Sequence, residues 1–349
     1  MINIVSRSKI FSNVTGPSKV VENLIKGLEK LDYPYVVNKR LDYCKRLYIH
    51  DDRIALGKVA ELSPEIRVLV GPNLYVAPRN IPAELDISKA VYLVPSEWNK
   101  RFWLHFGFNK CPMEAWPAGI DTDEFKPAGG NKEFVLVYFK QRFDRELDVL
   151  KKELEAKSLA YKILHYDKGY KEAEFKGLLE KSRYVIWLGR EESQGIALEE
   201  TLSAGVPILV CDVSSVGHLI GGNDLSQAEK DFKDTTSAEY FDDRCGIKIK
   251  DLGELSGAIE RMESSFKEFE PRQYILENLS LGGQARKLLG FYEKYFNLSY
   301  EAGLEDKPLH HGNWQNAKWS YVFYLKLKHK IKMLLVKIHL WDAVSNIMK

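Results

Sequence analysis

Two acidic residues flank a glycine in the second half of the chain. Glu192 and Glu200 lie before and after Gly195, in a stretch that predicts strand, polar loop, helix, turn and strand. Glycine lets the backbone approach a ligand closely, and the first N–H groups of a helix, unpaired within it, attract anions. The groups concerned belong to Ser193, Gln194, Gly195 and Ile196. Because a carboxylate accepts hydrogen bonds from two hydroxyls, the pair suits a polyol that carries an anion; stabilisation of the helix start is the alternative role.

Basic residues gather after another predicted strand, at 134–139. Three of them follow it and lead into a helix predicted at 145–157: Lys140, Arg142 and Arg145. Cations at a helix N-terminus oppose its dipole, so this placement favours an anionic partner over an ordinary basic helix start.

The elements that must position these residues alternate regularly. Short apolar runs predict strands at 2–5, 47–49, 66–70, 90–94, 113–116, 134–139, 161–165, 184–188 and 206–211. Amphipathic stretches between them predict helices at 20–31, 145–157, 172–181 and 196–204. Alternation of strands and helices favours parallel sheets with helices on both faces. Ligands bind such sheets beyond the carboxyl ends of the strands.

A proline followed by two glycines, in Phe125-Lys-Pro-Ala-Gly-Gly-Asn131, predicts a linker between two such blocks. The length of 349 residues also favours two domains. We therefore expect an α/β protein with doubly wound domains at 1–127 and 128–283, which face a cleft. A helix at 284–298 would cross back to the first domain, and 299–349 would form a tail that begins as a loop.

Composition excludes several classes of protein. Hydrophobic residues make up 45% and charged residues 29%, which is typical of a globular chain rather than a disordered one. The four cysteines form no C-x-x-C pair, which argues against a disulfide scaffold or a thiolate zinc site and favours a reducing compartment. Outside the tail the charge is slightly negative, so nucleic acid is not an expected partner. With neither a signal peptide nor an apolar spanning run, we expect a cytoplasmic protein.

The region from Glu192 to Pro207 resembles the E-x7-E region of GT-B glycosyltransferases, most closely the retaining family 4 group. The family pattern runs E-x-F-G, then the second glutamate, then A-x-x-G-V-P; this chain has Gln194 where the family has Phe. Three further segments resemble family motifs and occur in the family's order: 15–22, 94–98 and 116–127. The resemblance covers roughly 1–297 and is strongest from 90 to 212.

The resemblance implies two Rossmann-like domains: an acceptor domain at 1–127 and a nucleotide-sugar domain at 128–283. It implies that Glu192 binds the sugar hydroxyls and Glu200 the ribose of a nucleotide-diphosphate sugar. The diphosphate leaving group would be held by the amides near Gly195 and by one or two of the cations Lys140, Arg142 and Arg145. Gly16 would open a turn close to the diphosphate.

Two further residues are candidate sugar or acceptor contacts. Many family members carry a histidine after the strand that matches 66–70, but Gly71-Pro72-Asn73 stands there in this chain. Asn73 is one substitute, and His50, at the end of the preceding strand, is the other; a structural role for His50 is the alternative. No metal or other cofactor is expected, because the Asp121-Thr-Asp123 triplet fits the GT-B segment better than a metal-binding D-x-D motif.

The tail is strongly basic, with seven lysines against one acid from Lys318 to Lys349. Residues 318–341 combine an apolar helical face with lysines and aromatics, which is typical of a helix in an anionic membrane interface. Packing on the protein's own body or on a twin subunit is the alternative.

The resemblance implies a retaining, hexosyltransferase-type enzyme that moves a sugar from a nucleotide-diphosphate sugar to an acceptor. With the basic tail, we expect a glycan or lipid-linked acceptor in surface polysaccharide or glycoconjugate synthesis, and an enzyme peripheral on the cytoplasmic face of a membrane. A nucleotide-sugar 2-epimerase and a catalytically silent sugar-nucleotide or glycan-binding protein remain as alternatives, because fold does not fix function.

Overall fold

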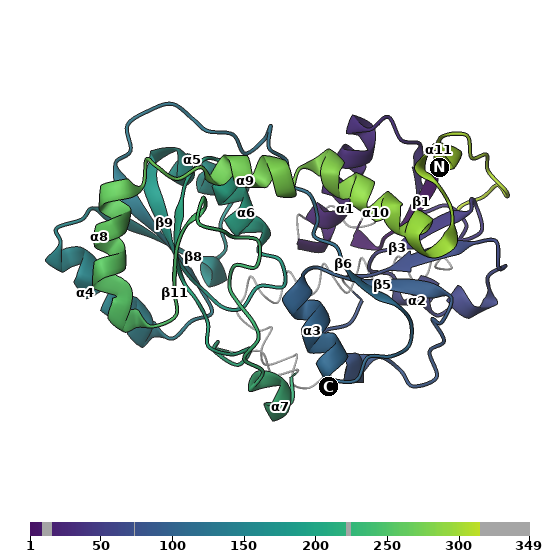
Figure 1. Cartoon of the computed structure of the whole chain (residues 1–349), viewed down its shortest axis with the longest axis horizontal. Helices are drawn as coiled ribbons and strands as arrows, with labels where there is room; N and C mark the ends of the chain where they lie inside the picture. Colours follow the sequence, from purple (N-terminus) through teal and green to yellow (C-terminus); the bar gives the residue numbers. More distant parts are fainter. Residues whose placement is uncertain (9–15, 73, 221–224, 315–349) are drawn as a thin grey trace, which may run out of the picture.

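The computed structural model describes residues 1–8, 16–72, 74–220 and 225–314, and it contains two α/β domains side by side (Figure 1). The first domain is built on a parallel sheet with strand order β2-β1-β3-β4-β5-β6. The strands are β1 (Ile2–Val5), β2 (Tyr35–Val37), β3 (Arg46–Ile49), β4 (Arg67–Val70), β5 (Ala90–Val94) and β6 (Met113–Ala115).

The second domain is built on a parallel sheet of order β11-β10-β9-β7-β8. The strands are β7 (Phe134–Lys140), β8 (Tyr161–His165), β9 (Ser182–Gly189), β10 (Ile208–Cys211) and β11 (Gly246–Ile249). The chain runs from β7 to β8 on one side and from β9 to β10 on the other, so the order reverses between β7 and β9. Ligands bind beyond the carboxyl ends of strands at such a point.

Helices cover both faces of each sheet, as the apolar strands require. In the first domain α1 (Gly16–Lys30) and α10 (Leu281–Phe296) cover one face, and α2 (Arg53–Leu56) and α3 (Glu97–His105) the other. In the second domain α4 (Asp144–Ala156) and α8 (Leu255–Ser265) lie opposite α5 (Glu172–Lys181), α6 (Ile196–Ser203) and α9 (Pro271–Asn278). The described residues also contain the short helices α7 (Gln227–Lys230) and α11 (Tyr300–Leu304), and 3-10 turns at Val59–Glu61, Pro78–Asn80, Tyr166–Lys168 and Leu252–Glu254.

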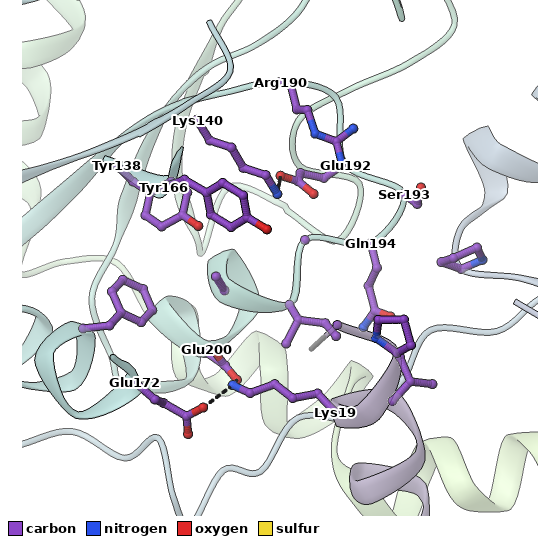
Figure 2. Close-up of a pocket in the computed structure, with 18 of the residues that line it drawn as sticks. Lys19, Tyr138, Lys140, Tyr166, Glu172, Arg190, Glu192, Ser193, Gln194 and Glu200 are labelled. Carbon is purple, nitrogen blue, oxygen red and sulfur yellow. Dashed lines mark hydrogen bonds and ion pairs between the residues drawn. The ribbon is translucent and has the colours of Figure 1, made fainter. Parts of the chain in front are cut away.

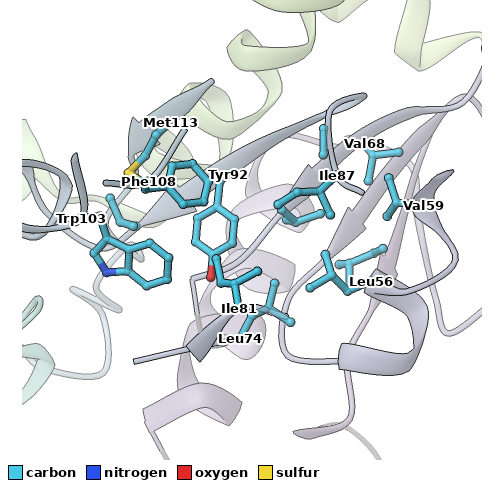
Figure 3. Close-up of a cluster of buried hydrophobic side chains, with 14 of the residues drawn as sticks. Leu56, Val59, Val68, Leu74, Ile81, Ile87, Tyr92, Trp103, Phe108 and Met113 are labelled. Atoms are coloured by element: carbon cyan, nitrogen blue, oxygen red, sulfur yellow. The ribbon is translucent and has the colours of Figure 1, made fainter. Parts of the chain in front are cut away.

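The cores lie between these helices and the sheets. Figure 3 shows one of them, in the first domain, where Trp103, Phe108 and Met113 pack around Tyr92. In the second domain every residue of β7 is buried, which fits its position inside a covered parallel sheet.

The chain returns to the first domain near its C-terminal end, where α9 and α10 follow one another across the junction (Figure 1). Helix α10 packs closely on α1, since a Cβ at Gly27 would lie 2.4 Å from the carbonyl oxygen of Leu281. Trp116 Nε1 also donates to Gln284 O at 2.9 Å. This helix therefore belongs to the core of the first domain although the second domain precedes it in sequence.

The structure confirms the predicted fold of two doubly wound parallel-sheet domains. The edge strands β2 and β11 are additional to those predicted. The loop expected directly after 298 contains helix α11, and Trp314 N then donates to Asn38 O at 2.9 Å. The predicted amphipathic segment 318–341 lies outside the described residues. Among those described, no helix has both the length and the apolar character needed to cross a membrane.

Candidate active site

A cavity of about 730 Å³ lies between the domains, at the carboxyl ends of both sheets (Figure 2). The predicted site residues that line it are Gly16, Lys140, Glu192, Ser193, Gln194, Gly195, Ile196 and Glu200. The structure therefore brings together residues from the end of β7, the loop after β9, helix α6 and the first turn of α1.

Lys140 and Glu192 meet at the point where strand order reverses. Lys140 ends β7 and pairs in register with Gly189, the last residue of β9. Its Nζ lies 2.6 Å from Glu192 Oε1, and both side chains are about nine-tenths buried. The same ammonium lies 4.3 Å from the ring centroid of Tyr166. A carboxylate and a cation thus lie together at the floor of the cavity. The carboxylate can accept hydrogen bonds from hydroxyl groups, and the cation can bind a phosphate.

Helix α6 begins at the cavity with a left-handed residue. Gly195 has φ +95°, a conformation that favours glycine, and its carbonyl accepts hydrogen bonds from Leu198 N and Glu199 N. The N–H groups of the first helical residues have no acceptor within a helix and point out of its end. At this end they face the cavity, where an anion would satisfy them.

Glu200 lies one helical turn further along and contacts the first domain. Lys19, from α1, donates to Glu200 and to Glu172 Oε2, the latter at 2.9 Å (Figure 2). Burial raises the pKa of Glu200 to about 7, although the ammonium of Lys19 acts in the opposite direction. Glu200 therefore changes charge near neutral pH. Its ionised form is stabilised by the ammonium of Lys19.

Aromatic rings form one wall of the cavity. Tyr138 stacks on Trp187 with ring centroids 4.0 Å apart and planes 4° apart. The hydroxyl of Tyr138 lies 3.1 Å from that of Tyr170. Tyr166 is 41% exposed and presents its ring to solvent beside Lys140. Flat apolar surfaces of this kind suit a planar nucleobase.

The first domain holds the loop between Glu192 and α6 in place. Trp98 Nε1 donates to Glu192 O at 2.9 Å. Gln194 makes two hydrogen bonds with the backbone of Ala118, one from Ala118 N at 2.9 Å and one to Ala118 O at 2.8 Å. It also donates to Glu199, a carboxyl whose burial raises its pKa well above the ordinary value. Gln194 thus lines the cavity and joins the domains.

Arg142 is directed away from the cavity. Its guanidinium is 1% exposed and binds the carboxylate of Glu146 through two hydrogen bonds, at 2.9 and 2.6 Å. It also donates to the carbonyls of Gly189 and Cys211, at 3.0 and 2.9 Å. These groups end β9 and β10, so Arg142 joins the ends of two strands to the start of α4. Its donors are engaged within the protein and do not face a phosphate in the cavity.

Two more predicted residues lie outside the cavity lining. Arg145 is exposed on α4, with its guanidinium 5.1 Å from the ring centroid of Phe143. His50 is buried, with Nε2 3.1 Å from Pro17 O and Nδ1 3.0 Å from the hydroxyl of Tyr48. Burial lowers the pKa of His50, and the contact of its Nε2 with Pro17 O holds the first turn of α1. Asn73 lies outside the described residues.

Arg190 lines the cavity and was not predicted. It follows β9 directly, next to Lys140 across the strand pair, and its Nη1 lies 2.6 Å from Glu191 Oε1. Its position immediately after a strand beside the reversal of strand order was the signal that could have identified it. Lys19 lies at the predicted N-terminal turn, where it was a possible helper in binding. Its contact with Glu200 and the aromatic wall join segments distant in sequence, so no local pattern indicated them.

The Asp121-Thr-Asp123 triplet binds lysines of α1. Asp121 lies 2.7 Å from Lys26 Nζ and accepts hydrogen bonds from the next backbone amides, while Asp123 lies 2.6 Å from Lys30 Nζ. Within the part of the chain that the structure describes, no group of His, Cys, Asp and Glu is arranged to hold a metal ion.

Comparison with solved structures finds the same arrangement of two domains in other proteins. Sucrose-phosphate synthase from Thermosynechococcus elongatus matches with a TM-score of 0.57 at 10% identity, over 85% of this chain and 99% of that one. Alr3699/HepE from Anabaena, solved with UDP and glucose, matches with a TM-score of 0.51 at 12% identity, over 84% and 99%. These neighbours are GT-B glycosyltransferases. The chain has the GT-B fold. Neither a family model nor a curated protein sequence matches it.

Proposed function

We propose that the protein is a retaining glycosyltransferase that moves a hexose from a nucleotide-diphosphate sugar to an acceptor. The observation that supports this most is the meeting of Glu192, Lys140, Glu200 and the start of α6 in one cavity between the domains. A sugar, a diphosphate and a ribose each have a suitable partner there. The UDP and glucose bound to HepE are ligands of the classes that this assignment requires.

The diphosphate would lie between the amides at the start of α6 and the cations Lys140 and Arg190. Negative charge develops on the diphosphate as the bond to the anomeric carbon breaks, so cations fixed in place lower the barrier. Arg190 takes the role that the sequence assigned to Arg142 or Arg145. These protein cations supply the compensating charge, and the proposed reaction requires no metal.

The two glutamates would bind the hydroxyls of the donor. Glu192 accepts from the transferred sugar, and Lys140 Nζ lies 2.6 Å from its carboxylate at the floor of the cavity. Glu200 accepts from the ribose, and Lys19 stabilises its charged form. The aromatic wall at Tyr166 would pack on the base.

The acceptor would enter from the first domain. We propose a glycan or lipid-linked acceptor in the synthesis of a surface polysaccharide or glycoconjugate. The basic segment 318–341 would attach the enzyme to an anionic membrane on its cytoplasmic side.

The glutamates provide the direct test. Glu192→Gln and Glu200→Gln keep side-chain size but remove the charge, and we expect kcat/KM for the donor to fall about 100-fold for Glu192→Gln. Glu174→Gln, an exposed position on α5 outside the cavity, is the matched control. Transfer at the wild-type rate by both cavity variants would contradict the roles. A product formed from the donor alone would instead indicate an epimerase.

A further inference from the structure

A second cavity, of about 400 Å³, adjoins the first on the side of the first domain. Residues that line both cavities form the boundary between them: Pro17, Pro72, Pro95, Arg190 and Ser193. Aromatic side chains line much of the remainder: Tyr75, Trp98, Phe102 and Trp103. A ligand in the second cavity would therefore lie next to one in the first, with apolar ring surfaces around it.

Arg53 lines this second cavity and is oriented by two contacts. Its Nε donates to Leu74 O at 2.7 Å, and its guanidinium carbon lies 4.5 Å from the ring centroid of Tyr75. The side chain is exposed. Its two terminal amino groups make no hydrogen bond or ion pair with any other residue that the structure describes. One hydrogen bond and one ring contact thus orient the guanidinium, and its two terminal amino groups can donate to a ligand.

The charge of the second cavity is unbalanced. Its other cation, Arg190, has Nη1 2.6 Å from Oε1 of Glu191, the carboxylate in the lining. Asp52, next to Arg53 in sequence, uses its carboxylate to cap α2 and to accept from Trp314 Nε1 at 3.2 Å. Among the residues that the structure describes, no carboxylate of this lining therefore balances the positive charge of Arg53, which we take to be available to a ligand.

We propose that the second cavity binds the acceptor and that Arg53 binds an acidic group on it, a carboxylate or a phosphate. This inference rests on the proposed function. A guanidinium matches both anions through two parallel hydrogen bonds, a geometry that lysine lacks. The aromatic lining packs on the apolar face of the acceptor sugar. The shared boundary at Arg190 and Ser193 then places the acceptor hydroxyl beside the donor.

Titration of the full-length chain with matched probes tests this. Methyl β-D-glucuronide and methyl β-D-glucoside differ only in the carboxylate, and glucose 6-phosphate supplies the phosphate. We expect at least one acidic probe to bind about tenfold more tightly than the glucoside, as for one charge-assisted hydrogen-bonded pair. The acid that is preferred identifies the source of the negative charge.

Variants test whether Arg53 causes the tighter binding of the acidic probe. Arg53→Gln should abolish it, and Arg53→Lys should retain less than half of it because the paired donors are lost. Arg286→Gln is the matched control, since Arg286 is also exposed and lies 5.0 Å from a tyrosine ring, that of Tyr300, outside both cavities. Equal binding of acidic and neutral probes, no binding of either acid, or a preference that survives Arg53→Gln would overturn the proposal.

The test of Arg53 can fail without the proposed function failing, and the two failures give different results. Nucleotide sugars should raise the melting temperature of Arg53→Gln as much as that of the wild type, because Arg53 does not line the donor cavity. If no nucleotide sugar stabilises the wild type, the proposed function fails. If they stabilise it but the acid preference is absent, only the role of Arg53 fails.

Discussion

Replacement of Arg142 by methionine should destabilise the second domain without removing a ligand contact. The sequence places this residue among the phosphate-binding cations, whereas the structure directs its guanidinium into the protein. Arg142→Met keeps much of the side-chain volume and removes the donors to Glu146, Gly189 and Cys211. The variant therefore separates a structural role from a role in binding.

The expected loss in the free energy of unfolding depends on the partners of Arg142 that stay buried in the variant. Removal of one partner of a buried ion pair costs about 3–5 kcal/mol, because the other charge stays in a medium of low polarity. His218 Nε2 still lies 3.0 Å from Glu146, and Ser237 still donates to the carbonyl of Gly189 at 3.1 Å. We therefore expect a loss near the lower end of that range, about 3 kcal/mol.

Equilibrium urea unfolding followed by tryptophan fluorescence measures this loss. Arg145→Met is the matched control on the same helix, and as an exposed position it should change the free energy of unfolding by less than about 0.5 kcal/mol. The double variant Arg142→Met/Glu146→Leu removes both charges and should recover at least half of the loss.

Burial alone would raise the pKa of Glu146, but hydrogen bonds from His218 and Arg142 hold it at about 2. The stability from this carboxylate is therefore present above its unfolded pKa near 4.5 and is lost as the pH falls towards 2. Arg142→Met should weaken that acid dependence. An unchanged unfolding curve together with lost stabilisation by nucleotide sugars would refute the reasoning, because Arg142 would then reach the ligand.

Two further predictions concern Glu200 and the tail. Burial raises the pKa of Glu200 to about 7, so the stability from its protonated form is complete below about 4.5 and is lost as the pH rises through 7. Between pH 4.5 and 8 the wild type should lose on the order of 3 kcal/mol more than Glu200→Gln, and parallel pH profiles would contradict this. Truncation after residue 317 should abolish flotation with anionic liposomes; a truncated chain that still floats is attached by another surface.

The sequence predicted the residues whose position follows from strand ends. Lys140 closes β7 and Glu192 follows β9, and parallel neighbours bring their carboxyl ends together. Gly195 and Glu200 follow from the helix that begins after the same loop. Periodicity and turn residues predicted the strands and the helix that carry these positions, and the two doubly wound sheets. The choice of Lys140 also drew on the resemblance to GT-B glycosyltransferases.

The direction of individual cations could not be predicted. Arg142 turns inward because the carbonyls of Gly189 and Cys211 end strands adjacent in space but distant in sequence. Lys19 reaches Glu200 across the domain boundary, a contact that no local pattern encodes. Periodicity indicates the face on which a residue lies, whereas these pairings depend on how the domains pack.

A crystal structure with a bound donor tests the central claim most directly. The donor would be whichever of UDP-, GDP-, ADP- and TDP-glucose raises the melting temperature most. We predict that its diphosphate lies within hydrogen-bond distance of Lys140 and the amide of Ile196, with a sugar hydroxyl on the carboxylate of Glu192. A donor bound outside the cavity between the domains would contradict the account.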